Sequence, residues 1–279
     1  MKIAVLPNLT KQAAQTCTEE VLAILKQSGC DTVLKTDLFT KHGVYRQGQD
    51  EEVLRECDLF VAIGGDGTII HTAKLAASLD KPILGVNAGT LGFTAGVERH
   101  ELSLLSHLAD GDYREEKRLM LSVQLETEKG SYHYYALNDA VLSGEPAKII
   151  DYRMLLGRRS YNYRADGFIV ATPTGSTAYS LSAGGPVIEP SMDCLVYTPI
   201  CPHSLFNRSV IFKGDSPLLV DIPENIGRLY LSVDGEPPLD VSEGDRLTFS
   251  RAERFARFVR LGKQDFYDTL NRKIIETRP

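Results

Sequence analysis

Short apolar runs alternate with helical patterns over the first part of the chain. Three apolar runs are typical of buried strands, and they cover residues 3–6, 58–63 and 82–86. Three segments carry apolar side chains at helical spacing, and they cover residues 11–27, 68–79 and 98–109. Strands that alternate with helices predict βαβ units on a parallel sheet.

The pattern changes after about residue 118. Strands are predicted over residues 120–125, 132–142, 153–156 and 229–233. Turns with Gly, Asp and Pro separate them, as in an all-β domain. One more strand is predicted over 255–261, and a helical stripe with Phe266, Leu270 and Ile274 follows. We therefore predict an α/β domain of residues 1–118, which segment 262–279 rejoins, and a β-rich domain of residues 119–261.

Composition narrows the class of protein. A chain of 279 residues suits about two domains, and its net charge of -6 disfavours nucleic-acid binding. The five cysteines form no CxxC pair, which indicates free thiols in a reducing compartment.

No signal peptide is expected at the start of the chain. The uncharged stretch 167–188 contains too many glycines and prolines for a lipid-facing helix. We expect a cytoplasmic protein that does not enter a membrane.

The most informative short segment is Gly64-Gly65-Asp66-Gly67-Thr68, directly after the second predicted strand. Glycines here allow a sharp turn and let a phosphate approach the backbone N–H groups, and the following helix starts at the same place. The segment matches neither the dinucleotide fingerprint nor the Walker loop. A plain strand-to-helix turn is the simpler interpretation of the glycines alone.

Asp66 favours a functional interpretation of this loop. A carboxylate among groups that attract phosphate would repel the ligand unless it has a task there. It would accept a proton from an attacking hydroxyl or hold a metal ion. The alternative is that Asp66 caps the helix. His71, one turn further along, could approach the same site.

Two later segments carry polar groups that suit a small polar ligand. Asn138 and Asp139 follow a strand-like run and could bind sugar hydroxyls and a purine edge, although a turn explains them equally well. Residues 166–186 form a Gly/Pro-containing run rich in small hydroxylated residues, in which Tyr179 could stack on a flat ring.

Four arginines stand three residues apart near the end of the chain: Arg251, Arg254, Arg257 and Arg260. They predict a solvated strand and loop face, with a phosphate-binding strip as the alternative.

Taken together, these segments resemble the NAD kinase family. The resemblance runs in order over essentially the whole chain and is carried by residues 64–68, 87–93, 137–139, 166–186, 198–205 and 232–235. The glycine–aspartate loop is shared with diacylglycerol kinases, sphingosine kinases and phosphofructokinases, whereas the stretch from Thr172 to Tyr179 is specific to this family. The resemblance implies an α/β N-terminal domain with a Rossmann-like parallel sheet, an all-β NAD-binding C-terminal domain, and transfer of a phosphoryl group from ATP to the 2′-hydroxyl of the adenosine ribose of NAD.

The resemblance also implies roles for individual residues. Asp66 would be the catalytic base, and Gly65, Gly67 and Phe93 would line the phosphate and adenosine region. Asn138, Asp139 and Thr174 would hold the adenosine moiety, with Asp139 standing where many family members have Glu. Asp166, Ala178 and Ser182 would contact the nicotinamide half, with Tyr179 nearby; Arg164 and Thr177 complete the expected substrate-binding set. Mg²⁺ would arrive with ATP, without protein ligands, and a homodimer or homotetramer is expected.

Two other functions remain open at this point. A lipid kinase of the diacylglycerol or sphingosine type would share the glycine–aspartate loop, but it needs an apolar slot and a membrane-facing patch that the sequence does not offer clearly. A non-catalytic NAD-sensing module would bind the dinucleotide without consuming ATP, and Asp66 counts against it. The sequence leaves open whether polyphosphate replaces ATP, whether NAD or NADH is preferred, and whether NADP(H) regulates the protein.

Overall fold

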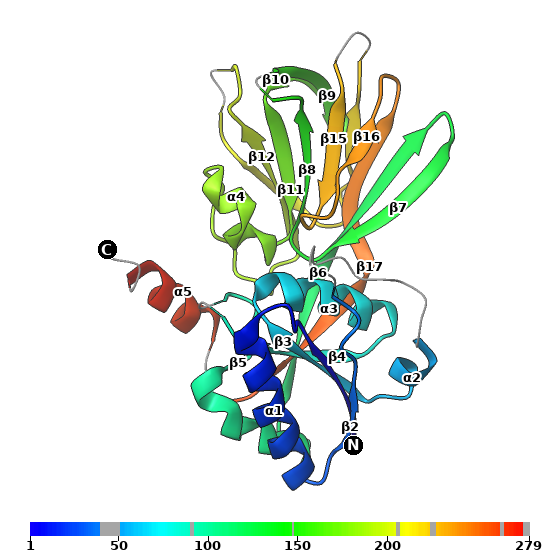
Figure 1. The fold of residues 1–279 in the computed structure, drawn as a ribbon. Coiled ribbons are helices and arrows are strands. Elements are labelled where there is room, and N and C mark those ends of the chain that lie inside the picture. Colours follow the sequence, from blue (N-terminus) through cyan, green and yellow to red (C-terminus); the bar gives the residue numbers. More distant parts are fainter. Residues whose placement is uncertain are drawn as a thin grey trace. The chain divides into compact units, whose positions relative to one another are not determined.

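The computed structural model describes residues 1–39, 51–89, 92–146, 148–204, 207–223, 227–262 and 265–275. The chain divides into two compact units, Met1–Arg118 with Ala256–Pro279, and Leu119–Phe255 (Figure 1). The sequence pattern predicts the return to the first domain at residue 262, but residues 256–261 already belong to the first unit. The reason is strand β17 (Arg246–Arg260), because its last part pairs in parallel with a strand of the first unit.

A mostly parallel sheet forms the centre of the first unit. Its strands run in the order β2 (Asp31–Leu34), β1 (Lys2–Pro7), β3 (Leu59–Gly64), β4 (Pro82–Asn87) and the end of β17, and β5 (Val97–Glu98) also pairs with β4. Every residue of β3 and β4 is buried. The three predicted apolar runs are therefore adjacent strands of one parallel sheet.

The helices of the first unit are α1 (Gln12–Gln27), α2 (Glu51–Arg55), α3 (Asp66–Ser78), η1 (Arg99–Leu108) and α5 (Phe266–Ile275). Helix α1 buries Ala14, Cys17, Val21 and Leu25 in one cluster with strand residues, as its helical stripe predicts. The helix predicted over 98–109 is the 3₁₀ helix η1. Its buried leucines recur every third residue, at 102, 105 and 108, which matches three residues per turn.

The second unit is built almost entirely from strands. One antiparallel sheet has the order β13 (Val210–Lys213), β12 (Cys194–Ile200), β11 (Gly167–Ala171), β8 (Asp139–Gly144), β15 (Leu229–Val233) and β16 (Leu239–Val241). A second set pairs β10 (Arg159–Ala165), β9 (Ile150–Leu156), β14 (Leu218–Asp221) and the start of β17, with β6 (Arg114–Thr127) and β7 (Gly130–Ala136) beside it. Two short helices, η2 (Gly175–Thr177) and α4 (Tyr179–Ser182), follow β11.

The core of the second unit joins apolar side chains from both sets of strands. At its centre, the ring of Phe168 packs against the rings of Tyr152, Tyr197 and Phe249. The hydroxyls of Tyr152 and Tyr197 share a buried hydrogen bond of 2.5 Å. This satisfies two polar groups that would otherwise be stranded among apolar side chains.

One predicted strand is interrupted. Residues 132–142 form two strands, because β7 ends at Ala136 and β8 begins at Asp139. The break contains Leu137 and Asn138, and it is part of the site described below. In the described ranges, no helix has the length and apolar character needed to cross a membrane.

Candidate functional site

The glycine loop, residues 64–67, joins β3 to α3 in the first unit. Strand β3 ends at Gly64, and α3 begins at Asp66 with Gly65 as its N-cap residue. No side chain of the described residues caps this helix, so the alternative that Asp66 is the helix cap is wrong. The first N–H groups of an α-helix lack intrahelical partners and attract anions. The loop therefore has the construction expected of a phosphate site.

The Asp66 carboxylate accepts three hydrogen bonds from the chain that follows β4. The Phe93 N–H donates to Oδ2 at 3.0 Å, and the Thr94 N–H and hydroxyl donate to Oδ1 at 3.2 and 2.5 Å. A Cβ at Gly92 would lie 2.3 Å from Asp66 Oδ1, so only glycine allows this approach. The structure thus brings Phe93 to the glycine loop, as expected, and adds Thr94, which the sequence analysis missed.

Lys11 is a second residue that the sequence analysis missed. It precedes α1, is exposed, and its Nζ lies 3.8 Å from the position that a Cβ of Gly65 would occupy. Strands β1 and β3 are parallel neighbours, so the chain leaving β1 reaches the same sheet edge as the glycine loop. Asn8 donates a 3.1 Å side-chain hydrogen bond to the hydroxyl of Thr68, which joins the two segments. The sequence could have indicated Lys11, because this lysine stands in the segment that follows the first predicted strand.

The arginines at the end of β17 are engaged with the protein. Arg260 donates from Nε to Glu116 at 2.9 Å and from Nη1 to the carbonyl of Ala95 at 2.9 Å. Arg257 donates to Glu115 and to the carbonyl of Asp80. Only 13% of the Arg260 side chain is exposed. The prediction that Arg260 lies on a solvated face is therefore wrong.

In the second unit, Arg251 pairs with Asp193, and the Arg254 guanidinium lies 4.2 Å from the centre of the Tyr135 ring. A spacing of three on a strand alternates between its two faces. A continuous strip of four arginines therefore does not form on β17.

The break between β7 and β8 is held by Asp234, which follows β15. Its carboxylate accepts the backbone N–H groups of Leu137, Asn138 and Asp139 at 2.7, 2.8 and 3.1 Å. The Asp234 N–H donates in return to the carbonyl of Asp139 at 2.9 Å. The side-chain oxygen of Asn138 is buried and accepts no hydrogen bond from the described residues. Because buried polar atoms are normally paired, this oxygen suits a donor group of a ligand.

Asp139 is almost fully buried, with 6% of its surface exposed. Burial, together with the nearby Asp234 carboxylate, raises the pKa of Asp139 from 3.8 to about 7. Asp234 accepts three N–H groups, which favour its charged form, so the proton of this pair belongs on Asp139. A protonated Asp139 would donate a hydrogen bond as well as accept one.

The hydroxylated run after β11 folds onto this break. The Thr172 hydroxyl donates to the carbonyl of Leu137, and its N–H donates to the carbonyl of Asn138 at 2.8 Å. A Cβ at Gly175 would lie 2.1 Å from the Asn138 carbonyl oxygen, so this position requires glycine. Thr174 precedes Gly175 in the chain and therefore lies near Asn138, and its expected role at the adenosine moiety stays a prediction.

The remaining buried hydroxyls of the run are satisfied within the second unit. The Ser176 hydroxyl donates to the carbonyl of Pro173 and accepts the N–H of Ile188, and the hydroxyls of Ser180 and Thr198 share a bond of 3.0 Å. Beyond this buried part, the ligand-facing candidates are accessible: Thr177 and Ala178 are half-buried, and Tyr179 and Ser182 are exposed.

Arg164 and Asp166 lie apart from the candidate residues that follow β11. They precede β11, whereas Thr174 follows it, and the five residues of the strand span about 15 Å. Both side chains are exposed, and Arg164 Nε lies 3.9 Å from an oxygen of Asp151. Their expected contact with the nicotinamide half stays a prediction.

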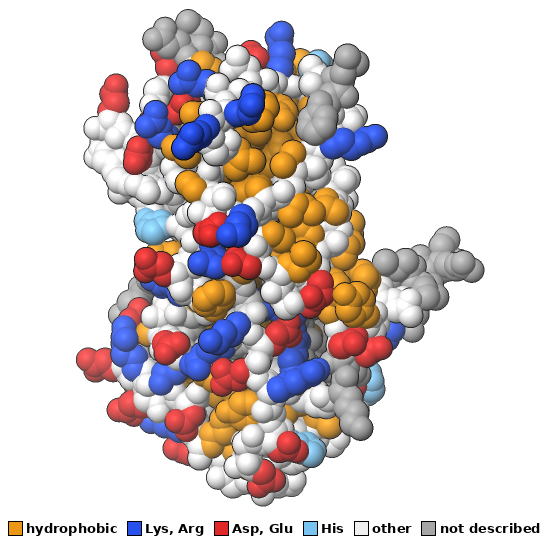
Figure 2. Space-filling model, turned by 180° about the vertical axis from the view of Figure 1, so that it is seen from behind, with side chains coloured by type: hydrophobic (Ala, Val, Ile, Leu, Met, Phe, Trp, Pro, Cys, Tyr) orange, Lys and Arg blue, Asp and Glu red, His pale blue; other side chains and the backbone are white. Residues whose placement is uncertain are grey.

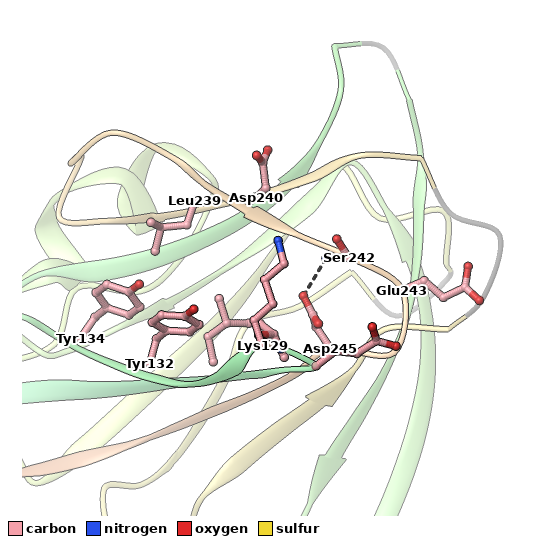
Figure 3. A pocket seen from close by; sticks show the side chains of 11 residues that line it. Lys129, Tyr132, Tyr134, Leu239, Asp240, Ser242, Glu243 and Asp245 are labelled. Carbon is pink, nitrogen blue, oxygen red and sulfur yellow. Dashed lines mark hydrogen bonds between the residues drawn. The ribbon is translucent and has the colours of Figure 1, made fainter.

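A separate cavity of about 420 Å³ lies in the second unit between β6, β7, β16 and the turn after β16 (Figure 3). Tyr132 and Tyr134 lie side by side on one wall, and Lys129 points towards Asp240. Asp245, at the end of the turn, accepts the N–H of Ser242 at 2.8 Å. None of the residues predicted from the sequence lines this cavity, so the candidate site is not built on it.

The surroundings of Asp66 bear on the alternative in which this carboxylate holds a metal ion. Within the described ranges, no three His, Cys, Asp or Glu side chains gather in a way that could hold a metal ion. The Asp66 carboxylate is already held by three donors of the protein. Its surroundings suit a proton acceptor better than a metal ligand.

Two family models match the chain. The ATP-NAD kinase N-terminal domain matches residues 3–113, and the ATP-NAD kinase C-terminal domain matches residues 137–261. The chain belongs to the NAD kinase family. It is 40% identical to an NAD kinase of Symbiobacterium thermophilum over 99% of both chains, and 36% identical to one of Geotalea daltonii over 98% of both.

Solved structures agree with this assignment. The chain is similar to an NAD kinase from Archaeoglobus fulgidus in complex with ATP, with a TM-score of 0.76 and 26% identity over 98% of both chains. It also shares its fold with the yeast NADH kinase complexed with NADH, at a TM-score of 0.84 and 23% identity over 100% of this chain and 89% of the other. The predicted combination of an α/β and a β-rich domain is confirmed.

Proposed function

We propose that this chain transfers the γ-phosphoryl group of ATP to the 2′-hydroxyl of the adenosine ribose of NAD, producing NADP. Membership of the NAD kinase family supports the substrate and the product. The observation that carries the proposal is the Asp66 carboxylate, held beside the glycine loop at the start of α3. Such a position serves both phosphate binding and proton removal.

In the reaction, the ribose 2′-oxygen forms a bond to the γ-phosphorus while the bond from that phosphorus to the bridging oxygen breaks. ADP leaves with the electron pair of the broken bond, and the hydroxyl proton passes to Asp66 and then to solvent. The backbone N–H groups at the start of α3 and the Lys11 ammonium stabilise charge on the phosphate oxygens.

The second unit would recognise the dinucleotide. The buried oxygen of Asn138 offers an acceptor to the adenosine moiety, and Asp139 offers a donor in its protonated form. Thr174, beside Gly175 in the chain, would complete this group. The exposed ring of Tyr179 offers a flat surface to the nicotinamide half, beside Ala178 and Ser182.

The expectation of Mg²⁺ is carried forward as part of the proposal. The ion would reach the site on the phosphates of ATP, since Mg²⁺ is rarely caged by protein ligands alone. When bound, it neutralises charge on the transferring group.

The test is NADP formation by the purified protein with NAD, Mg²⁺ and ATP. Parallel reactions omit ATP, replace it with polyphosphate, or offer diacylglycerol as the acceptor. Asp66→Asn is expected to lower kcat by at least ~10²-fold while NAD still binds, because a general base is lost. The matched control is Asp110→Asn, an exposed carboxylate of the same unit. Turnover of Asp66→Asn within about threefold of wild type would exclude Asp66 as the base. Phosphorylated lipid would support a lipid kinase instead, and NAD binding without NADP under any donor would support a sensing module.

Self-association and a cytoplasmic location complete the proposal. Exposed apolar side chains of the second unit, such as Met192 and Ile211 at 50% each, are available for contact with another copy. Figure 2 shows hydrophobic side chains gathered in patches on one face of the molecule. The five free cysteines, four of them buried, suit a reducing compartment. Light scattering after size-exclusion chromatography would decide between a dimer, a tetramer and a monomer.

A further inference from the structure

The carboxylate loop, residues 92–96, provides the donors to Asp66 and is itself held from behind. The N–H of Gly96 donates to the carbonyl of Gly85 in β4 at 2.9 Å. Arg260 Nη1 donates to the carbonyls of Ala95 at 2.9 Å and Thr94 at 3.4 Å. The loop is therefore anchored to two strands of the sheet in the first unit.

Arg260 is in turn fixed by its own partners. Its Nε donates to Glu116 at 2.9 Å, and its guanidinium lies 5.6 Å from the centre of the Phe258 ring. Glu116 also pairs with Arg118, and the two arginines hold the pKa of Glu116 below its ordinary value although burial opposes them. Glu116 is thus charged at neutral pH, and the ion pair with Arg260 persists there.

The three donors leave the two oxygens of Asp66 unequal. Oδ1 accepts both the N–H and the hydroxyl of Thr94, whereas Oδ2 accepts only the N–H of Phe93 among the described residues. A carboxylate oxygen has about two acceptor positions. Oδ1 is therefore saturated, and Oδ2 keeps one position for a further donor.

We propose that Thr94 and Arg260 are positioning residues for the catalytic base, and that Asp66 Oδ2 is the atom that takes the proton of the ribose hydroxyl. The inference rests on the proposed function. Thr94 occupies Oδ1 and sets the plane of the carboxylate, and Arg260 keeps the loop that carries Thr94 in place. Neither residue contacts the substrate in this scheme, so both affect the chemical step and leave substrate binding unchanged.

The test compares Thr94→Val, Thr94→Ser and Arg260→Gln in steady-state kinetics with NAD and ATP. Valine keeps the shape of threonine and removes its hydroxyl, so kcat is expected to fall about tenfold, the effect of losing one hydrogen bond to a charged group. Both KM values should stay within about twofold. Serine keeps the hydroxyl and should restore most of kcat. The control is Arg257→Gln, since Arg257 lies on the same strand and contacts Asp80 and Glu115; its kcat should stay near that of wild type.

A double-mutant cycle distinguishes positioning from a general structural effect. If Thr94 acts through Asp66, Thr94→Val will lower kcat in the wild-type protein and change it little in the Asp66→Asn protein. An equal fall in both backgrounds, or no difference between the valine and serine variants, would overturn the inference. So would an unchanged kcat for Arg260→Gln. A wild-type protein that forms no NADP would instead refute the proposed function, and the two failures are therefore separate.

Discussion

The buried carboxylate of Asp139 makes stability depend on pH in a direction opposite to that of most acidic residues. Burial and the Asp234 carboxylate raise the pKa of Asp139 from 3.8 to about 7 in the folded protein. Between these two values the folded state binds the proton and the unfolded state does not. The contribution of Asp139 to the free energy of unfolding is therefore fully present below pH 3.8 and is lost as the pH rises towards 7.

The magnitude follows from the size of the shift. One pKa unit corresponds to about 1.4 kcal/mol, so a shift of roughly three units costs about 4 kcal/mol once Asp139 is charged. About 2–3 kcal/mol of this cost falls between pH 5 and pH 8. Asp139→Asn keeps a neutral polar side chain of similar size and has no proton to lose. Relative to wild type, this variant should gain about 2–3 kcal/mol of stability from pH 5 to pH 8.

The assay is urea unfolding followed by circular dichroism at pH 5, 6, 7 and 8. Asp221→Asn is the matched control in the same unit. Burial alone would raise the pKa of Asp221, but hydrogen bonds from Arg246 and Arg153 hold it below 3.8. The stability that Asp221 contributes is present above its unfolded pKa and is lost only as the pH falls further. Its variant should therefore differ from wild type by the same amount at pH 5 and at pH 8. The reasoning would be refuted if the stability difference between Asp139→Asn and wild type were also the same at pH 5 and at pH 8.

Two further predictions concern substrate binding. Tyr179→Ala removes an exposed ring and should raise the KM for NAD more than the KM for ATP in initial-rate measurements; equal changes would place the ring outside the acceptor site. Lys11→Met removes an ammonium beside Gly65 and should raise the KM for ATP about fivefold, as expected for the loss of a charged hydrogen-bond donor to phosphate. The control is Lys26→Met at the other end of α1, and a KM for ATP equal to that of wild type would contradict the assignment of Lys11.

The sequence analysis located the glycine loop because its signals are local. A buried apolar strand, three glycines and a helical stripe occur within about 20 consecutive residues, and backbone geometry alone brings them together. The position of Asp66 at the start of α3 follows directly from that order. Its partners could not be predicted in this way, because Thr94 lies 28 residues further along.

The break between β7 and β8 shows the opposite situation. Residues 132–142 have the alternation of one continuous strand, and nothing in that segment marks the interruption. Asp234 causes it by accepting three consecutive N–H groups. The carboxylate comes from a residue more than 90 positions away along the chain, and only folding makes this interaction available.

The sequence by itself indicated the central strands of the parallel sheet, the two-part organisation and the family, since these depend on periodicity and on short motifs. Tertiary structure decided which polar groups are buried, which partners they bind and whether they are charged. It placed Arg260 behind the carboxylate loop instead of in solvent, and it buried Asp139 next to a second carboxylate. Hydrogen bonding and desolvation depend on distances between residues that are remote in sequence. For this reason the sequence predicts candidate residues such as Asp66 and Asp139, whereas their hydrogen-bond partners, including Thr94, and the charge of Asp139 required the fold.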